Sequence, residues 1–122
     1  MTITSFEIVS IPVLDAQKAK AFYRDVMGFT LVREEPMGPD MTWIQLAPKG
    51  SPVTIALVTW FDNLKPGGQQ GLMVNSDNID ADRDALMAKG VEVGPIGQQA
   101  WGRHAMFSDP DGNGWILRQA LT

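Results

Sequence analysis

Three side chains in the C-terminal part of this chain could do chemistry: the single histidine, His104, and the arginines Arg103 and Arg118. An imidazole can act as a general acid or base near neutral pH, or it can be an ordinary hydrogen-bonded residue within a sheet. A guanidinium can hold a carboxylate or phosphate through two hydrogen bonds, but arginines close to a strand end are often solvated or ion-paired. The sequence leaves both roles open for each residue.

Tryptophan is the second residue type that points to a binding role, because the chain contains four of them. Trp43, Trp60 and Trp101 fall at strand or loop positions, where they could rim a site and stack on planar or cationic organic molecules. Each of the three could equally belong to the core or to a subunit interface. Trp115 is assigned to the core.

The composition is that of an ordinary globular domain, with 122 residues, 44% hydrophobic and 20% charged. The net charge of -4 and the scattered basic residues argue against a nucleic-acid partner. The absence of cysteine excludes disulfides, thiolate metal ligands and a cysteine nucleophile. No signal-peptide pattern and no membrane-spanning apolar run are present, so we expect a cytoplasmic protein with no membrane partner.

The hydrophobic periodicity predicts the order β-α-β-β-β twice within a single domain, 1–122. The first module, 1–63, contains a helix that Asp15 caps and Gly28 ends. Its strands are predicted at 8–13, at 42–46 and at 53–58, with a further strand that starts at 29–32. A Pro/Gly-rich connector follows at 64–70. The second module, 71–122, contains a helix that Asn78 or Asp80 caps and Gly90 ends, with strands at 72–75, 91–93, 100–107 and 114–119.

The segment Phe107–Leu117 reads F-S-D-P-D-G-N-G-W-I-L, a tight turn between two strands. The first module adds a D-x-x-x-A-x-x-F-Y-x-x-x-x-G-F pattern that starts at Asp15, and the second adds Trp101-Gly102. With these motifs the whole chain resembles the glyoxalase/bleomycin-resistance/dioxygenase family, also called the vicinal oxygen chelate superfamily. The resemblance implies an α+β fold in which two tandem βαβββ modules form a curled mixed sheet around a cleft, commonly in a homodimer.

Metal-dependent members of this family hold a divalent ion with His, Glu or Gln on the first and last strands of each module. The resemblance maps these ligand positions onto Ile8, Gly71 and Ile116, and no His, Glu or Asp occurs between Met41 and Trp60. The acidic cluster Asp80, Asp82 and Asp84 lies where carboxylates complement a helix N-terminus, so we interpret it as a solvated cap. We therefore expect no metal ligands and no cofactor, with a divalent metal as the alternative.

The resemblance also implies which side chains face the cleft, through strand alternation. The concave face would carry Ile8, Ser10, Pro12, Met73, Asn75, His104, Met106, Ile116 and Arg118. Val9, Ile11, Val13, Val74, Phe107, Trp115 and Leu117 would pack beneath the helices. We expect the ligand-binding residues to be Ser10, Trp43, Gln45, Met73, Asn75, Trp101, His104, Met106 and Arg118, with His104 as the candidate catalytic residue.

Three functions are compatible with such a cleft. The one that the sequence favours is metal-independent binding of a small organic molecule, a drug, natural product or metabolite, in the manner of bleomycin-resistance proteins. The second is an enzyme: a metal-dependent lyase, isomerase or dioxygenase with non-standard ligands, or an acid–base enzyme that uses His104. The third is a subunit that acts through protein contacts, for which Trp60-Phe61 would be the exposed apolar patch or the homodimer seam.

Overall fold

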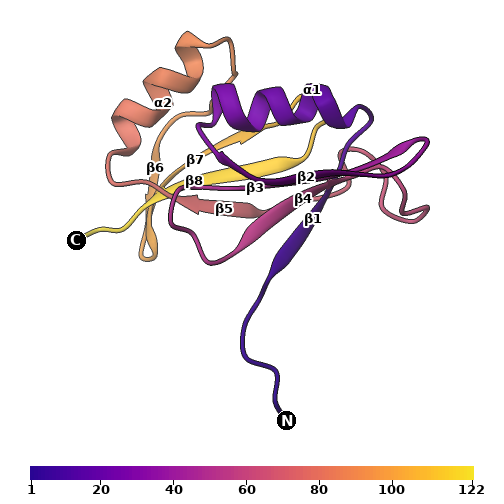
Figure 1. Ribbon diagram of the computed structural model, residues 1–122. Helices are drawn as coiled ribbons and strands as arrows, with labels where there is room; N and C mark the ends of the chain where they lie inside the picture. Colours follow the sequence, from indigo (N-terminus) through magenta and orange to yellow (C-terminus); the bar gives the residue numbers. More distant parts are fainter. The chain divides into compact units, whose positions relative to one another are not determined.

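The computed structural model describes all 122 residues and contains two four-stranded mixed sheets, each with a helix (Figure 1). The predicted α+β fold of two tandem βαβββ modules is confirmed. The chain divides into two compact units, Met1–Pro66 and Gly67–Thr122, at a boundary within the predicted connector. None of the helices is long and apolar enough to cross a membrane.

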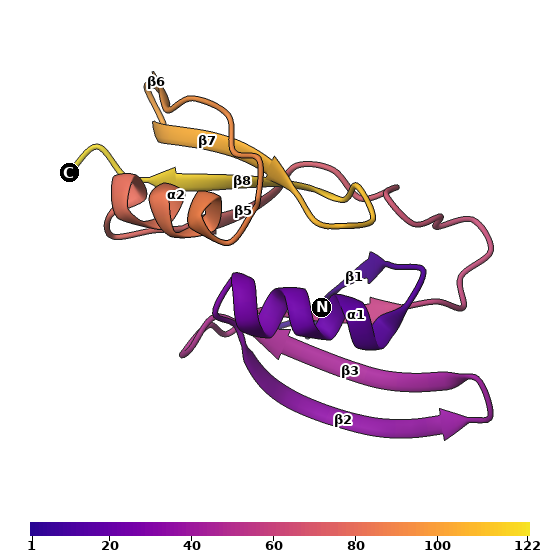
Figure 2. The same cartoon turned by 90° about the horizontal axis from the view of Figure 1, so that it is seen from above.

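The first unit has its strands in the order β1-β4-β3-β2, with β1 parallel to β4 and the other pairs antiparallel. Its elements are β1 (Ile8–Pro12), α1 (Ala16–Ala21), η1 (Phe22–Val26), β2 (Thr30–Gly38), β3 (Met41–Ala47) and β4 (Thr54–Val58). Helix α1 packs on one face of the sheet, over β3 and β4 (Figure 2). The core on that side contains Ile11, Ile44, Leu46 and Leu57, all fully buried.

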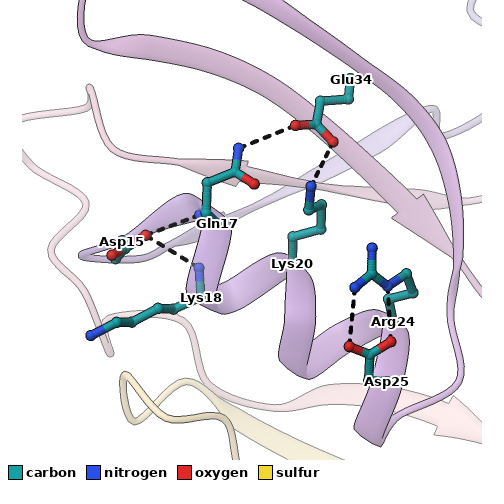
Figure 3. Close-up of polar contacts among 7 residues, drawn as sticks. All are labelled: Asp15, Gln17, Lys18, Lys20, Arg24, Asp25 and Glu34. Atoms are coloured by element: carbon teal, nitrogen blue, oxygen red, sulfur yellow. Dashed lines mark hydrogen bonds and ion pairs between the residues drawn. The ribbon is translucent and has the colours of Figure 1, made fainter.

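Helix α1 begins where the sequence predicts, because the carboxylate of Asp15 accepts hydrogen bonds from the backbone N–H groups of Gln17 at 3.1 Å and Lys18 at 3.2 Å (Figure 3). The last turn widens into the π-helix η1, where Met27 N–H donates to the Phe22 carbonyl at 3.1 Å. Gly28 then ends the helix with a φ of 74°.

Strand β2 forms the outer edge of the first sheet, and α1 is tied to it by polar contacts. Glu34 accepts hydrogen bonds from Lys20 Nζ at 2.9 Å and Gln17 Nε2 at 3.1 Å (Figure 3). These bonds lower the pKa of the Glu34 carboxyl below its usual value. The ion pair lies near the surface, where such a pair contributes about 0–1 kcal/mol, so these contacts mainly orient the edge.

The second unit has its strands in the order β5-β8-β7-β6, with β5 parallel to β8 and the other pairs antiparallel. Its elements are β5 (Leu72–Asn75), α2 (Ile79–Ala88), β6 (Gly97–Gln99), β7 (Gly102–Ser108) and β8 (Gly114–Gln119). Ala105, Phe107, Trp115 and Leu117 are buried on the face that α2 covers, with Ile79 and Leu86 of the helix (Figure 2). The assignment of Trp115 to the core is confirmed.

The strand predicted at 91–93 is wrong, and Gly97–Gln99 takes its place beside β7. Two backbone groups of the expected strand, and one just after it, have partners from α2. Val91 N–H donates to the Leu86 carbonyl at 3.1 Å, and the Arg83 guanidinium donates to the carbonyls of Val93 at 3.2 Å and Gly94 at 2.8 Å. Backbone groups that already take part in these hydrogen bonds are not available to pair with a neighbouring strand.

The turn between β7 and β8 is organised by the buried carboxylate of Asp109. Its Oδ1 accepts hydrogen bonds from the backbone N–H groups of Asp111 and Asn113, both at 2.9 Å, and its Oδ2 accepts from Asn113 Nδ2 at 2.8 Å. Asn113 is fully buried, and its Oδ1 accepts from Gln69 N–H at 3.2 Å. The turn therefore closes the hairpin and also anchors the segment that leads into β5.

We expect Asp109→Ala to lower the free energy of unfolding by about 2–4 kcal/mol, because three donors, two of them on the fully buried Asn113, lose a charged acceptor. Asp109→Asn should cost less, since it keeps one acceptor oxygen. Urea denaturation followed by far-ultraviolet circular dichroism measures both. The control is Asp77→Ala, at an exposed position before α2, which should change the free energy by less than about 0.5 kcal/mol. Equal effects at positions 109 and 77 would contradict this role.

Candidate functional site

The candidate site lies on the face of the second sheet opposite α2, which we call the helix-free face and define by six residues. Strand pairing sets Asn75 and His104 on either side of Arg118, so these three form a polar row. The same pairing sets Met73 and Met106 on either side of Ile116, which makes an apolar row. Both methionines are exposed, at 48% and 59%. The register, with the burial of Ala105, Phe107, Trp115 and Leu117 on the other side, places the two rows on the face opposite α2, and their role in lining a ligand cleft stays a prediction.

His104 is held between an aromatic ring and a glycine. The indole of Trp101 stacks on the imidazole, with ring centroids 4.9 Å apart and planes at 23°. Gly97, the register partner of His104 on β6, leaves room for the ring, because a Cβ there would lie 3.0 Å from Cε1 and 3.1 Å from Nε2. The Nε2 atom is buried and has no hydrogen-bond partner in the protein. The stack therefore presents one half-exposed indole and contains one buried nitrogen that has no partner in the protein.

Arg118 connects the two sides of the helix-free face. Its Nε donates to the Trp101 carbonyl at 2.7 Å, and its Nη1 donates to Asn75 Oδ1 at 2.8 Å. Gly102 is required beside it, because a Cβ at that position would lie 2.7 Å from the Gln119 carbonyl and 3.2 Å from Arg118 Nε. The structure thus brings together four predicted residues, Asn75, Trp101, His104 and Arg118, through contacts that strand alternation did not reveal.

Arg103 precedes His104 on β7, and its side chain lies on the opposite face of the sheet. Its guanidinium makes a bidentate ion pair with Asp80 of α2, with Nη1–Oδ2 at 2.9 Å and Nη2–Oδ1 at 3.2 Å. The hydrogen bond from Arg103 holds the pKa of the Asp80 carboxyl below its usual value. Of the two arginines that the sequence left ambiguous, Arg103 is ion-paired to the helix, whereas Arg118 is part of the helix-free face.

The first unit carries a second aromatic group, formed by Trp43 of β3 and Trp60, which lies two residues beyond the end of β4. Trp43 stacks on Trp60 with ring centroids 6.5 Å apart and planes at 25°. Trp43 Nε1 donates to Gln45 Oε1 at 3.0 Å, Gln45 Nε2 donates to Thr54 Oγ1 at 2.9 Å, and Thr54 Oγ1 donates to the Glu7 carbonyl at 2.9 Å. These bonds fix the orientation of the Trp43 indole.

Gln45 and Ser10, two of the predicted ligand-binding residues, lie in the sheet of the first unit. Gln45 is only 6% exposed and its amide is committed to Trp43 and Thr54, so we assign it a positioning role. Ser10 and Gln45 both pair in register with Ala56, which places them in one row of the sheet. Thr54 was not anticipated, because no feature of the sequence marks which threonine lies opposite a buried glutamine.

The residues present do not fit the divalent metal site of the metal-dependent relatives implied by the sequence. Ile8, Gly71 and Ile116 occupy the expected ligand positions, and none has a side-chain donor atom for a metal. No group of three or more His, Cys, Asp or Glu side chains is placed to hold a metal ion. In the acidic cluster, Asp80 is paired with Arg103, and Asp82 accepts a hydrogen bond from Ser76 Oγ.

Comparison with known proteins connects this architecture to one family. The model of the Glyoxalase/Bleomycin resistance protein/Dioxygenase superfamily matches residues 5–117. TnmS3, an antibiotic binding protein from Streptomyces sp. CB03234, is 43% identical with a TM-score of 0.93, and the match covers 98% of both chains. A glyoxalase/bleomycin resistance protein from the same organism is 44% identical with a TM-score of 0.86, over 94% of this chain and 100% of that one.

Among curated proteins, the chain is similar to YetH, an uncharacterized protein of Bacillus subtilis (strain 168). The two are 32% identical over 115 residues, which cover 91% of this chain and 94% of YetH. The likeness therefore extends over nearly the full length of both proteins.

We expect Arg103→Gln to raise the pKa of Asp80 toward the ordinary value for an aspartate, since it removes the hydrogen bond that lowers it. An NMR titration of the Asp80 side-chain carboxyl carbon measures the change. Because the folded-state pKa is depressed, the ion pair stabilises the fold at neutral pH, and its contribution is lost as the pH falls through that pKa. An unchanged pKa in the variant would contradict the assigned ion pair.

Proposed function

The chain belongs to the glyoxalase/bleomycin resistance protein/dioxygenase superfamily, and we propose that it binds a small organic molecule with an aromatic ring system, without a metal ion. The molecule would be a drug, a natural product or a metabolite. The observation that carries the proposal is the Trp101–His104 stack, held in place through Arg118 on the helix-free face. The likeness to an antibiotic binding protein over the whole chain supports the same role.

The helix-free face has the composition of a small-molecule site. The half-exposed Trp101 indole supplies a flat surface on which a ring can stack. Met73 and Met106 supply flexible, polarisable side chains that adapt to the shape of a ligand. Asn75, His104 and Arg118 supply a few polar contacts that can fix its orientation. An apolar surface with few polar groups is what binding requires, whereas chelate catalysis requires a set of metal ligands.

The aromatic group of the first unit supports the same role independently. Trp43 and Trp60 form a second stacked pair, and Gln45 holds the Trp43 indole in one orientation. A preoriented aromatic side chain binds more tightly than a mobile one, because less conformational entropy is lost when the ligand binds. We therefore propose Trp43 as a ligand contact, Gln45 as its positioning residue and Ser10 as a polar contact in the same row.

Metal independence is proposed from the donor set. Ile8, Gly71 and Ile116 stand where the resemblance puts metal ligands, and hydrocarbon or hydrogen cannot replace an imidazole or carboxylate. His104 would then act as a hydrogen-bonding residue of the binding site. The homodimer and the cytoplasmic location expected from the sequence stay predictions, and the binding role depends on neither.

We expect saturable binding of at least one compound from a panel of fused-ring aromatic natural products, measured by isothermal titration calorimetry. Trp101→Ala should weaken that binding about five- to tenfold, the loss expected from one aromatic stack. Arg103→Gln is the control, because Arg103 pairs with α2 on the opposite face and its loss should leave the affinity unchanged. Absence of saturable binding across the panel would contradict the proposed function.

We expect untagged protein to carry no stoichiometric divalent metal by elemental analysis. Titration with nickel, manganese, iron, zinc and magnesium should produce no concentration-dependent rise in Tm, because an ion that binds the native state would stabilise it. Stoichiometric metal, or a large stabilisation by one ion, would show that ligands other than those mapped here form a site.

A further inference from the structure

We propose, resting on the proposed function, that the molecule bound on the helix-free face of the second unit is an organic anion whose acidic oxygen pairs with Arg118. Arg118 is the single charged residue of this face, and its five neighbours there, Met73, Asn75, His104, Met106 and Ile116, include no acid. The chain as a whole has a net charge of -4. The face is therefore a local positive site on an acidic protein.

Arg118 differs from three of the four other arginines in having no carboxylate partner, and from the fourth, Arg83, in its place on the helix-free face. Arg24, Arg33 and Arg103 each pair with a carboxylate, at 2.9, 2.8 and 2.9 Å. Arg83 is bonded to two backbone carbonyls beside α2, outside the helix-free face. Both acceptors of Arg118 are neutral oxygens, so its positive charge has no counter-charge within the protein. A cationic ligand would be repelled there, and a neutral one would leave the charge uncompensated.

The guanidinium is also preorganised for a ligand. Its Nε and Nη1 are fixed by the Trp101 carbonyl and Asn75 Oδ1, while Nη2 makes no hydrogen bond to the protein. A guanidinium has five N–H donors in a rigid plane, so donor capacity remains after these two bonds are made. An oxyanion can accept a charge-assisted hydrogen bond from Nη2 without any change in the bonds that hold the side chain.

A second unsatisfied polar atom lies in the same row. His104 is the register partner of Arg118 across β7 and β8, and its buried Nε2 has no partner in the protein. The ring of His104 is in turn stacked on Trp101, whose carbonyl Arg118 holds. The stacking surface of Trp101 and the polar groups of His104 and Arg118 are therefore linked by direct contacts. A flat aromatic acid matches this combination, with its ring on Trp101 and its acidic oxygen at Arg118.

The test compares two probes that share a ring system and differ in charge, anthracene carboxylate and anthracene carboxamide, by isothermal titration calorimetry at neutral pH. We expect wild-type protein to bind the carboxylate about tenfold more tightly, the difference that one charge-assisted contact supplies. The preference should shrink in about 0.5 M NaCl, because salt screens a partly exposed pair. In Arg118→Gln the two probes should bind equally, and in the control Arg103→Gln the preference should persist.

The readout is the ratio of the two affinities, which a merely structural role of Arg118 would not change. Arg118→Gln also removes a contact to Trp101 and can weaken both probes together, so the ratio separates charge recognition from positioning. Arg118→Lys keeps the charge and should keep part of the preference. Equal binding of both probes by wild-type protein would overturn the anion inference and leave the proposed function standing. If neither probe binds, the inference falls, and the fused-ring panel decides whether the proposed function falls with it.

Discussion

The buried carboxylate of Asp109 is the interaction on which the second unit depends. It gathers three donors into the turn between β7 and β8 and thereby sets the register in which Phe107 faces Trp115 and His104 faces Arg118. A slip of one residue would turn every side chain of a strand to the other face. The same turn anchors the connector through Asn113 and Gln69, so the side chain of Asp109 organises both the hairpin and the approach to β5.

Once the register is set, the two faces of the second sheet acquire different electrostatic roles. Neighbouring strands carry Arg103 and Arg118, which point to opposite faces. Arg103 is neutralised by Asp80 at the start of α2, whereas Arg118 bonds to the neutral oxygens of Trp101 and Asn75. Its guanidinium therefore orders the aromatic side of the face and keeps its charge. Gln45 plays a comparable part in the first unit, where it orients Trp43 from a buried position.

In this family scaffold, Ile8, Gly71 and Ile116 stand at the positions where the resemblance places metal ligands. Ile8 lies in β1 and Ile116 in β8, whereas Gly71 lies just before β5 with a φ of 77°, and backbone pairing holds the sheets together. The fold is therefore compatible with several functions, and the chemistry of the exposed side chains distinguishes them. In this chain those side chains are aromatic, thioether, amide and guanidinium groups.

The sequence alone determined the features that depend on residues close together in the chain. The Asp15 cap, the helix ends at Gly28 and Gly90 and the Asp109–Asn113 turn are of this kind, since each involves a few adjacent positions, whereas the structure decided between Asn78 and Asp80 as the second cap. Tertiary structure alone decided which distant groups form contacts. Arg83 binds a carbonyl next to the segment that was predicted as a strand, Arg103 binds Asp80, and Arg118 binds Trp101 and Asn75. The reason is that a long polar side chain can reach several acceptors, and the strand register determines which of them lie within hydrogen-bonding distance. Register is a property of the folded sheet, so the sequence alone does not specify these pairs.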